Sequence, residues 1–122
     1  MSIQAYQRAS AQGDSPREAE YRIFATITAA LIRAKEQGRA SLPSLAEALD
    51  KNRRLWSALA QDCASPENVL PKPVRAQIIS LSMWVSRHSS AVMQNGEDID
   101  PLIDVNRSMM QGLAPGLRAA AG

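Results

Sequence analysis

The sequence has a single cysteine and a single histidine, Cys63 and His88, among its 122 residues. One cysteine cannot form an intramolecular disulfide, and the two side chains together supply too few of the usual ligands for a zinc site. The sequence also lacks a glycine-rich phosphate loop, a Gly-x-Ser-x-Gly elbow and a His-Glu-x-x-His motif. These absences predict a protein that is not an enzyme, with no catalytic residues, no metal site and no cofactor.

Long apolar runs and a secretory signal are missing as well. The longest stretches without charge, residues 23–32 and 76–86, are about half as long as the roughly 20 residues of a membrane-spanning helix. Residues 1–6 contain no basic region followed by an apolar one. We therefore expect a cytoplasmic protein without membrane insertion.

Charge of one sign is not concentrated anywhere in the sequence. Fourteen Lys and Arg residues stand against twelve Asp and Glu residues, and the longest basic run is the pair Arg53-Arg54. The five aromatic residues are too few for a base-stacking platform. Because a nucleic-acid interface usually has a denser basic patch, we expect no direct nucleic-acid binding.

Strand signals are scarce, whereas helix signals recur. The sequence has five Val and two Thr residues, and no alternation of apolar and polar residues reaches six positions. Residues 15–18, Ser-Pro-Arg-Glu, combine a capping hydroxyl, a first-turn proline and a glutamate at the third helical position. Gly38 suits a left-handed helix end. This pattern predicts a helix over residues 16–37.

The same helical periodicity predicts three more helices, over residues 44–63, 73–94 and 101–112. Two helical turns are also expected over residues 3–10, and residues 114–122 are expected to form a flexible tail. The predicted fold is all-α: one domain, residues 1–122, with three long helices and short N- and C-terminal helices in a small bundle. The seam positions expected to be buried are Ile23, Ile27, Leu31, Leu45, Leu49, Leu59, Ile78, Leu81 and Val85.

Cys63 and His88 could pair as nucleophile and base, but structural roles suit them better. Cys63 ends an apolar stripe, where a free thiol is typically a small core residue. His88 lies on a helix seam and is expected to be hydrogen-bonded in the core or at its rim.

Three carboxylates, Asp98, Asp100 and Asp104, resemble a cation site. Their spacing is too sparse for an EF-hand loop. Asp98 or Asp100 precedes Pro101, so capping of the last helix is the better interpretation.

Partner binding is the function class that these features leave open. Arg53 and Arg54 lie near Trp56, although ion pairs with Glu47 and Asp50 would explain the charges equally well. Apolar residues outside the seams, such as Trp84, Met109 and Met110, could form a surface that binds an amphipathic helix. Both tryptophans could instead belong to the core. The candidate partner-binding residues are Tyr6, Arg53, Arg54, Trp56, Trp84, Arg87, His88, Met109 and Met110.

Six ordered segments carry a family resemblance: residues 2–6, 17–22, 52–57, 75–81, 84–88 and 105–113. Together they make residues 2–113 resemble the FlaF family of flagellar biosynthesis regulators. The resemblance implies a cytoplasmic protein that binds flagellin and supports its production and secretion, as a flagellin export chaperone. It leaves an alternative: a post-transcriptional regulator of flagellin synthesis whose partner is the companion regulator FlbT or flagellin mRNA. The family contributes no catalytic residues.

Overall fold

The computed structural model describes residues 16–113, and 89% of these residues are helical, with none in a strand. The elements are α2 (Pro16–Gln37), the 3-10 helix η1 (Gly38–Ser41), α3 (Leu42–Ala64), α4 (Lys72–Asn95) and α5 (Asp100–Leu113). The all-α prediction is confirmed. The helical turns predicted over residues 3–10, the capping hydroxyl of Ser15 and the tail at residues 114–122 lie outside the described residues. No helix in the described range is long and apolar enough to span a membrane.

Proline and glycine set the helix boundaries, as the sequence predicts. Pro16 begins α2, and α3 and α4 each have a proline within their first two positions, where the missing N–H costs no intrahelical hydrogen bond. Gly38 and Gly96 adopt φ values of +60° and +70° directly after α2 and α4, a conformation that other residues rarely tolerate. The turn of 3-10 helix between α2 and α3 was not predicted, and α3 begins two residues before its predicted start.

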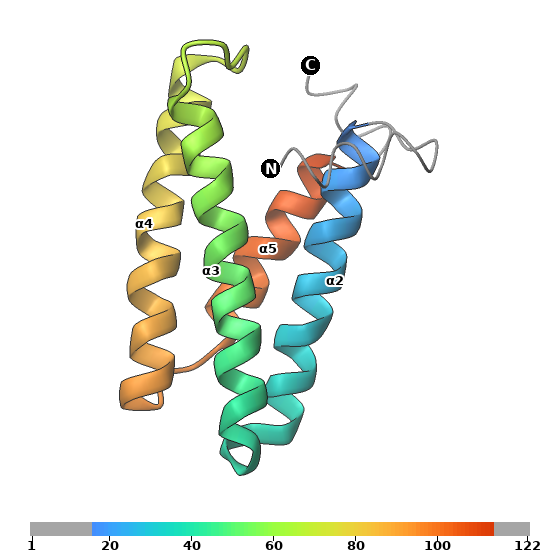
Figure 1. The fold of residues 1–122 in the computed structure, drawn as a ribbon, viewed down its shortest axis with the longest axis vertical. Helices are drawn as coiled ribbons and strands as arrows, with labels where there is room; N and C mark the ends of the chain where they lie inside the picture. Colours follow the sequence, from blue (N-terminus) through green and yellow to red (C-terminus); the bar gives the residue numbers. More distant parts are fainter. Residues whose placement is uncertain (1–15, 114–122) are drawn as a thin grey trace.

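The four α-helices run alternately up and down, with α3 between α2 and α4 (Figure 1). α5 packs mainly against α2 and only slightly against α4. The bundle therefore consists of an α3–α4 hairpin and an α2–α5 pair, which meet where α2 contacts α3.

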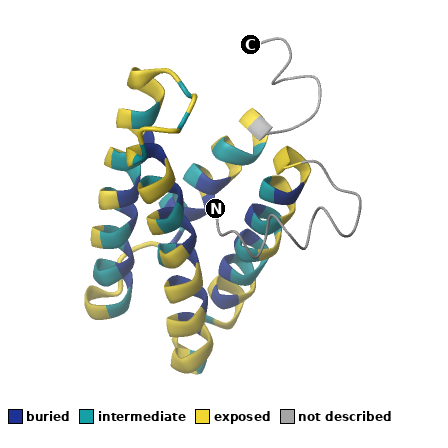
Figure 2. Ribbon diagram, turned by 45° about the horizontal axis from the view of Figure 1, so that its top comes forward, coloured by how far each residue is buried: buried dark blue, intermediate teal, exposed yellow. Residues whose placement is uncertain are grey.

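The core forms where the helices face one another, and Figure 2 shows buried residues on those inner faces. Trp56 is fully buried and meets Phe24 edge to face, with ring centroids 5.8 Å apart. Aromatic pairs favour this geometry because the positive ring edge points to the negative ring face. The predicted core positions that are buried are Leu31, Leu45, Leu49, Leu59, Ile78 and Val85.

Three predicted core positions, Ile23, Ile27 and Leu81, are only half-buried. The predicted α2 stripe is rotated by one residue, because Phe24 and Thr28 occupy the core face instead. Thr28 was overlooked because it is polar, yet its hydroxyl has a hydrogen-bond partner inside the bundle. Leu81 is less buried for another reason: it borders a groove between the helices.

A buried polar cluster joins α5 to α2 and α3. The Asn106 side-chain amide donates to Thr28 Oγ1 at 3.1 Å and to Asn52 Oδ1 at 2.8 Å, and its own Oδ1 accepts from Trp56 Nε1 at 2.9 Å. Asn52, Trp56 and Asn106 have no exposed surface. Buried polar groups are costly unless they are paired, so this cluster favours one register of α5 against its neighbours.

Candidate partner-binding groove

A groove of about 550 Å³ lies at the end of the bundle where α2 and α4 begin and α3 and α5 end. All four helices contribute side chains to it. Its large apolar lining residues are Leu59, Val69, Leu70, Val74, Ile78, Leu81, Val105 and Met109.

The groove follows from the way the helix pairs are held together. At the opposite end of the bundle, the short connection between α4 and α5 keeps the two pairs close. At the groove end, the α3–α4 hairpin and the α2–α5 pair are set apart (Figure 1). Seam residues in this region, such as Leu81, line the groove where closer helices would have covered them.

Exposed apolar side chains and charged side chains both contribute to the groove. Val69, on the α3–α4 connection, is 95% exposed, and Val74 is also exposed. Arg17, Glu20 and Asp62 supply charged groups to the lining. A mainly apolar groove of this kind suits an amphipathic helix that inserts its apolar face, with the charged side chains available to polar groups at the edge of the interface.

Cys63 lies at the base of the groove and is buried. Burial raises the pKa of its thiol, and the nearby Asp62 carboxylate raises it further. The thiol therefore stays neutral near pH 7, and a neutral thiol is a poor nucleophile. The prediction that Cys63 is a core residue is confirmed.

The Leu81→Ala variant tests how fully Leu81 is packed at the edge of the groove. Because Leu81 is half-buried at the groove edge, we expect the free energy of unfolding to fall by about 1–2 kcal/mol, below the roughly 2–5 kcal/mol of a fully packed leucine. Urea unfolding followed by circular dichroism measures this. A loss above about 3 kcal/mol would mean that Leu81 is fully packed between the helices and does not border the groove.

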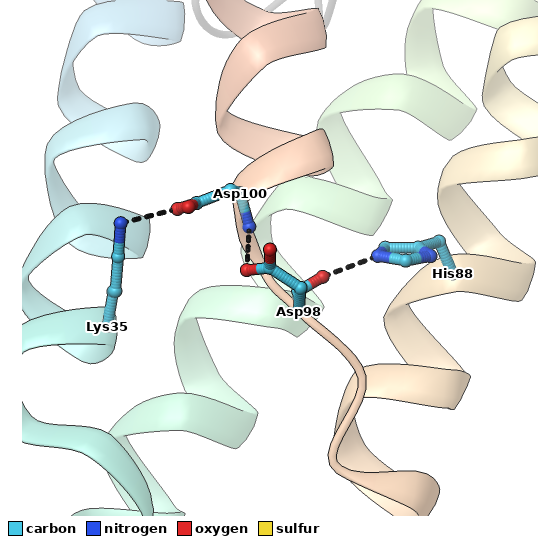
Figure 3. A network of polar contacts seen from close by, with 4 residues as sticks. All are labelled: Lys35, His88, Asp98 and Asp100. Atoms are coloured by element: carbon cyan, nitrogen blue, oxygen red, sulfur yellow. Dashed lines mark hydrogen bonds and ion pairs between the residues drawn. The ribbon is translucent and has the colours of Figure 1, made fainter.

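The network at the opposite end of the bundle holds the start of α5 in place (Figure 3). The Asp98 carboxylate accepts a hydrogen bond from the Asp100 backbone N–H at 2.9 Å. The backbone carbonyl of Asp98 accepts one from His88 Nε2 at 2.6 Å. The Asp100 carboxylate forms an ion pair with Lys35 at 2.6 Å; its hydrogen bond and charge raise the pKa of the Lys35 ammonium. The capping role of Asp98 is thus confirmed. No cluster of acidic, histidine or cysteine residues in the described range could hold a metal ion.

His88 is part of this network and of a second surface, on α4. The His88 ring stacks on Trp84 with centroids 5.1 Å apart and an interplanar angle of 13°. Both side chains are half-buried, while Arg87 and Met83 on the same helix are exposed. We call these four residues the α4 surface. Because Cys63 lies in the groove and His88 contacts the loop before α5, the hypothetical Cys–His pair is not formed.

The structure corrects one predicted partner-binding residue. Trp56 has no exposed surface, and its indole N–H is bonded inside the bundle, so its assignment as a partner contact is wrong. Arg54 forms an ion pair with Asp50 at 2.9 Å, and Lys51 forms one with Glu47 at 2.9 Å, as the alternative interpretation predicts. Arg53 is half-buried on the same helix, α3.

The other predicted partner-binding residues fall in different places. Met109 lines the groove, whereas Met110 packs against the core cluster. Trp84, Arg87 and His88 belong to the α4 surface, and Tyr6 lies outside the described residues. Leu59, Ile78 and Leu81 were not predicted to line a groove because their seam positions predicted burial. Pro71 and Pro73 are the signal in the sequence that could have indicated the groove, because they place a connection between helices at this end of the bundle.

A family model described as flagellar protein FlaF matches residues 2–113 of the chain. The match includes all the described helices, reaches residue 2 at one end and leaves residues 114–122 outside. No curated protein and no solved structure matches the chain.

Proposed function

Because the chain belongs to the FlaF family of flagellar proteins, we propose that it binds flagellin in the groove and supports flagellin secretion as an export chaperone. The groove is the observation that carries this proposal. It is apolar, open to solvent and lined by all four helices, as a receptor for an amphipathic helix requires.

The terminal segments of flagellin are the part of the partner that fits this site. They are expected to be unfolded in the monomer and helical in the filament, so their apolar faces would associate if left free. A segment that folds on docking would insert apolar side chains about one turn apart, at positions i, i+3 or i+4, and i+7. The groove would thereby cover the surface that otherwise self-associates.

Such binding is expected to be of moderate strength. A segment that folds as it binds loses conformational entropy, which offsets part of the interaction energy. A dissociation constant near the micromolar range, about −8 kcal/mol, would keep the segment covered and still permit its release at the export apparatus.

The test is a titration of purified chain into fluorescently labelled peptides from the two ends of flagellin, followed by anisotropy. Saturable binding of at least one peptide, together with an increase in its helical circular dichroism, is expected. An absence of binding by both peptides and by intact flagellin monomer would refute the chaperone function.

The Trp84→Ala variant tests whether flagellin binds in the groove or on the α4 surface. Trp84 does not line the groove, so we expect flagellin affinity to change by less than about threefold, well below the loss at a binding hot spot. A tenfold or greater loss, about 1.4 kcal/mol, without a comparable loss of stability would place the flagellin site on α4 instead.

A second function is favoured by the charge of α4. The helix has no acidic residue along its 24 positions, and no ion pair involves Lys72, Arg75 or Arg87 within the described part of the chain. An uncompensated basic helix suits a negatively charged partner, such as RNA. If the protein acts as a post-transcriptional regulator, its partner would be FlbT or flagellin mRNA. Copurification after nuclease treatment distinguishes the two: retained flagellin supports the chaperone, whereas retained FlbT alone, or RNA in an untreated sample, supports the regulator.

A further inference from the structure

The groove adjoins the point where the described chain begins. Pro16 and Arg17, the first two residues of α2, belong to its lining. Residues 1–15 are therefore attached directly to the rim of the groove. Five extended residues span roughly 16 Å, so residues 11–15 provide enough chain for the preceding residues to reach any part of this end of the bundle.

The sequence of this attached segment matches the chemistry of the groove. Residues 1–13 carry one charged side chain, Arg8, and their two largest apolar side chains, Ile3 and Tyr6, are three positions apart. In a helix that spacing places both on one face. The groove wall has the complementary apolar character, through residues such as Leu81 and Met109.

Of the two ends of the chain, the N-terminal one is the better candidate to occupy the groove. Gly112, near the end of α5, also lines the groove, so residues 114–122 are attached nearby too. However, the FlaF family match reaches back to residue 2 and leaves residues 114–122 outside. The C-terminal residues have a single large apolar side chain, Leu117, and so no pair of large apolar side chains at helical spacing.

We propose that residues 2–13 dock in this chain's own groove, through Ile3 and Tyr6, and compete there with the flagellin segment. The two helical turns expected over residues 3–10 would be marginal by themselves, so the docked segment is readily displaced. Its attachment to Pro16 compensates, because a short link gives an effective concentration in the millimolar range. The competition rests on the proposed function, whereas the docking does not.

Docking is measured on the full chain without flagellin, by nuclear Overhauser effects in a sample with labelled Val, Leu and Met methyl groups. We expect effects between the Tyr6 ring and methyl groups of Val74, Leu81, Val105 or Met109. The Ile3→Glu variant should lose them. Gln4→Glu, which introduces the same carboxylate one position away, should retain them. Absence of these effects in the full chain overturns the proposal.

Cys63 provides a second readout, because it is the single cysteine and lies in the groove. Deletion of residues 2–13 is expected to raise its rate of maleimide labelling about tenfold, as for a site covered about 90% of the time. Deletion of residues 117–122 should leave the rate unchanged. Excess peptide with the sequence of residues 2–13 should slow the labelling of the shortened chain. Equal rates in the full chain and the 2–13 deletion overturn the proposal.

The competition itself is tested by flagellin binding. Ile3→Glu is expected to increase the affinity for the flagellin peptide severalfold, and Gln4→Glu is expected to leave it unchanged. An unchanged or weaker affinity in Ile3→Glu refutes the competition. Because the first two measurements contain no flagellin, a failure of docking is distinguishable from a failure of the proposed function.

Discussion

Replacing Trp56 with alanine is expected to lower the free energy of unfolding by about 3–5 kcal/mol, as other large aromatic deletions do. The indole is fully buried, meets Phe24 edge to face and donates a hydrogen bond to Asn106. The substitution therefore leaves a cavity and an unpaired buried acceptor together. Urea unfolding followed by circular dichroism measures the loss.

Trp56→Phe divides this loss into its two causes. The smaller aromatic ring keeps much of the packing but removes the N–H that Asn106 Oδ1 accepts from, so we expect a loss of about 1–3 kcal/mol. A Trp56→Ala variant whose free energy of unfolding lies within about 1 kcal/mol of that of the original chain would contradict the buried position of the indole.

Replacing Met109 with aspartate is expected to weaken binding of the flagellin peptide at least about 30-fold, or 2 kcal/mol, on the scale of an interface hot spot. Met109 is a half-buried groove residue on α5, and a carboxylate there would have to lose water when an apolar helix face docks. Anisotropy titration measures the affinity, and circular dichroism confirms that the variant is folded.

Met83→Asp is the matched control for this substitution. Met83 is 57% exposed on α4 and does not line the groove, so the same change should alter flagellin affinity by less than about threefold. If Met83→Asp weakens binding and a folded Met109→Asp does not, flagellin binds the α4 surface.

The helices were predictable from local chemistry, whereas the groove was not. First-turn prolines and the positive-φ residues Gly38 and Gly96 act within a few positions, so their effect can be recognised in a short stretch of sequence. Periodicity indicates which side of a helix faces its neighbours. It does not indicate how far apart those neighbours are, and Leu81 and Met109 border the groove for that reason.

The polar residues of the core also show that spacing within one helix does not reveal contacts between helices. Asn52 lies on the buried face of α3, but its partner Asn106 on α5 is 54 positions away. Thr28 completes the contact from α2. Spacing within one helix cannot indicate that polar residues on three helices are joined by hydrogen bonds, so the α2 stripe was assigned to Ile23 and Ile27. Trp56 was misassigned for a related reason, since its hydrogen-bond partner is also on α5.

The central claim is that flagellin occupies the groove, and methyl chemical-shift mapping tests it most directly. Unlabelled flagellin peptide is titrated into chain with labelled Val, Leu and Met methyl groups. The account predicts the largest shifts at Leu59, Val74, Leu81 and Met109, with Met83 little changed. Shifts confined to Met83 and its neighbours on α4, with the groove methyl groups unchanged at saturation, would contradict it.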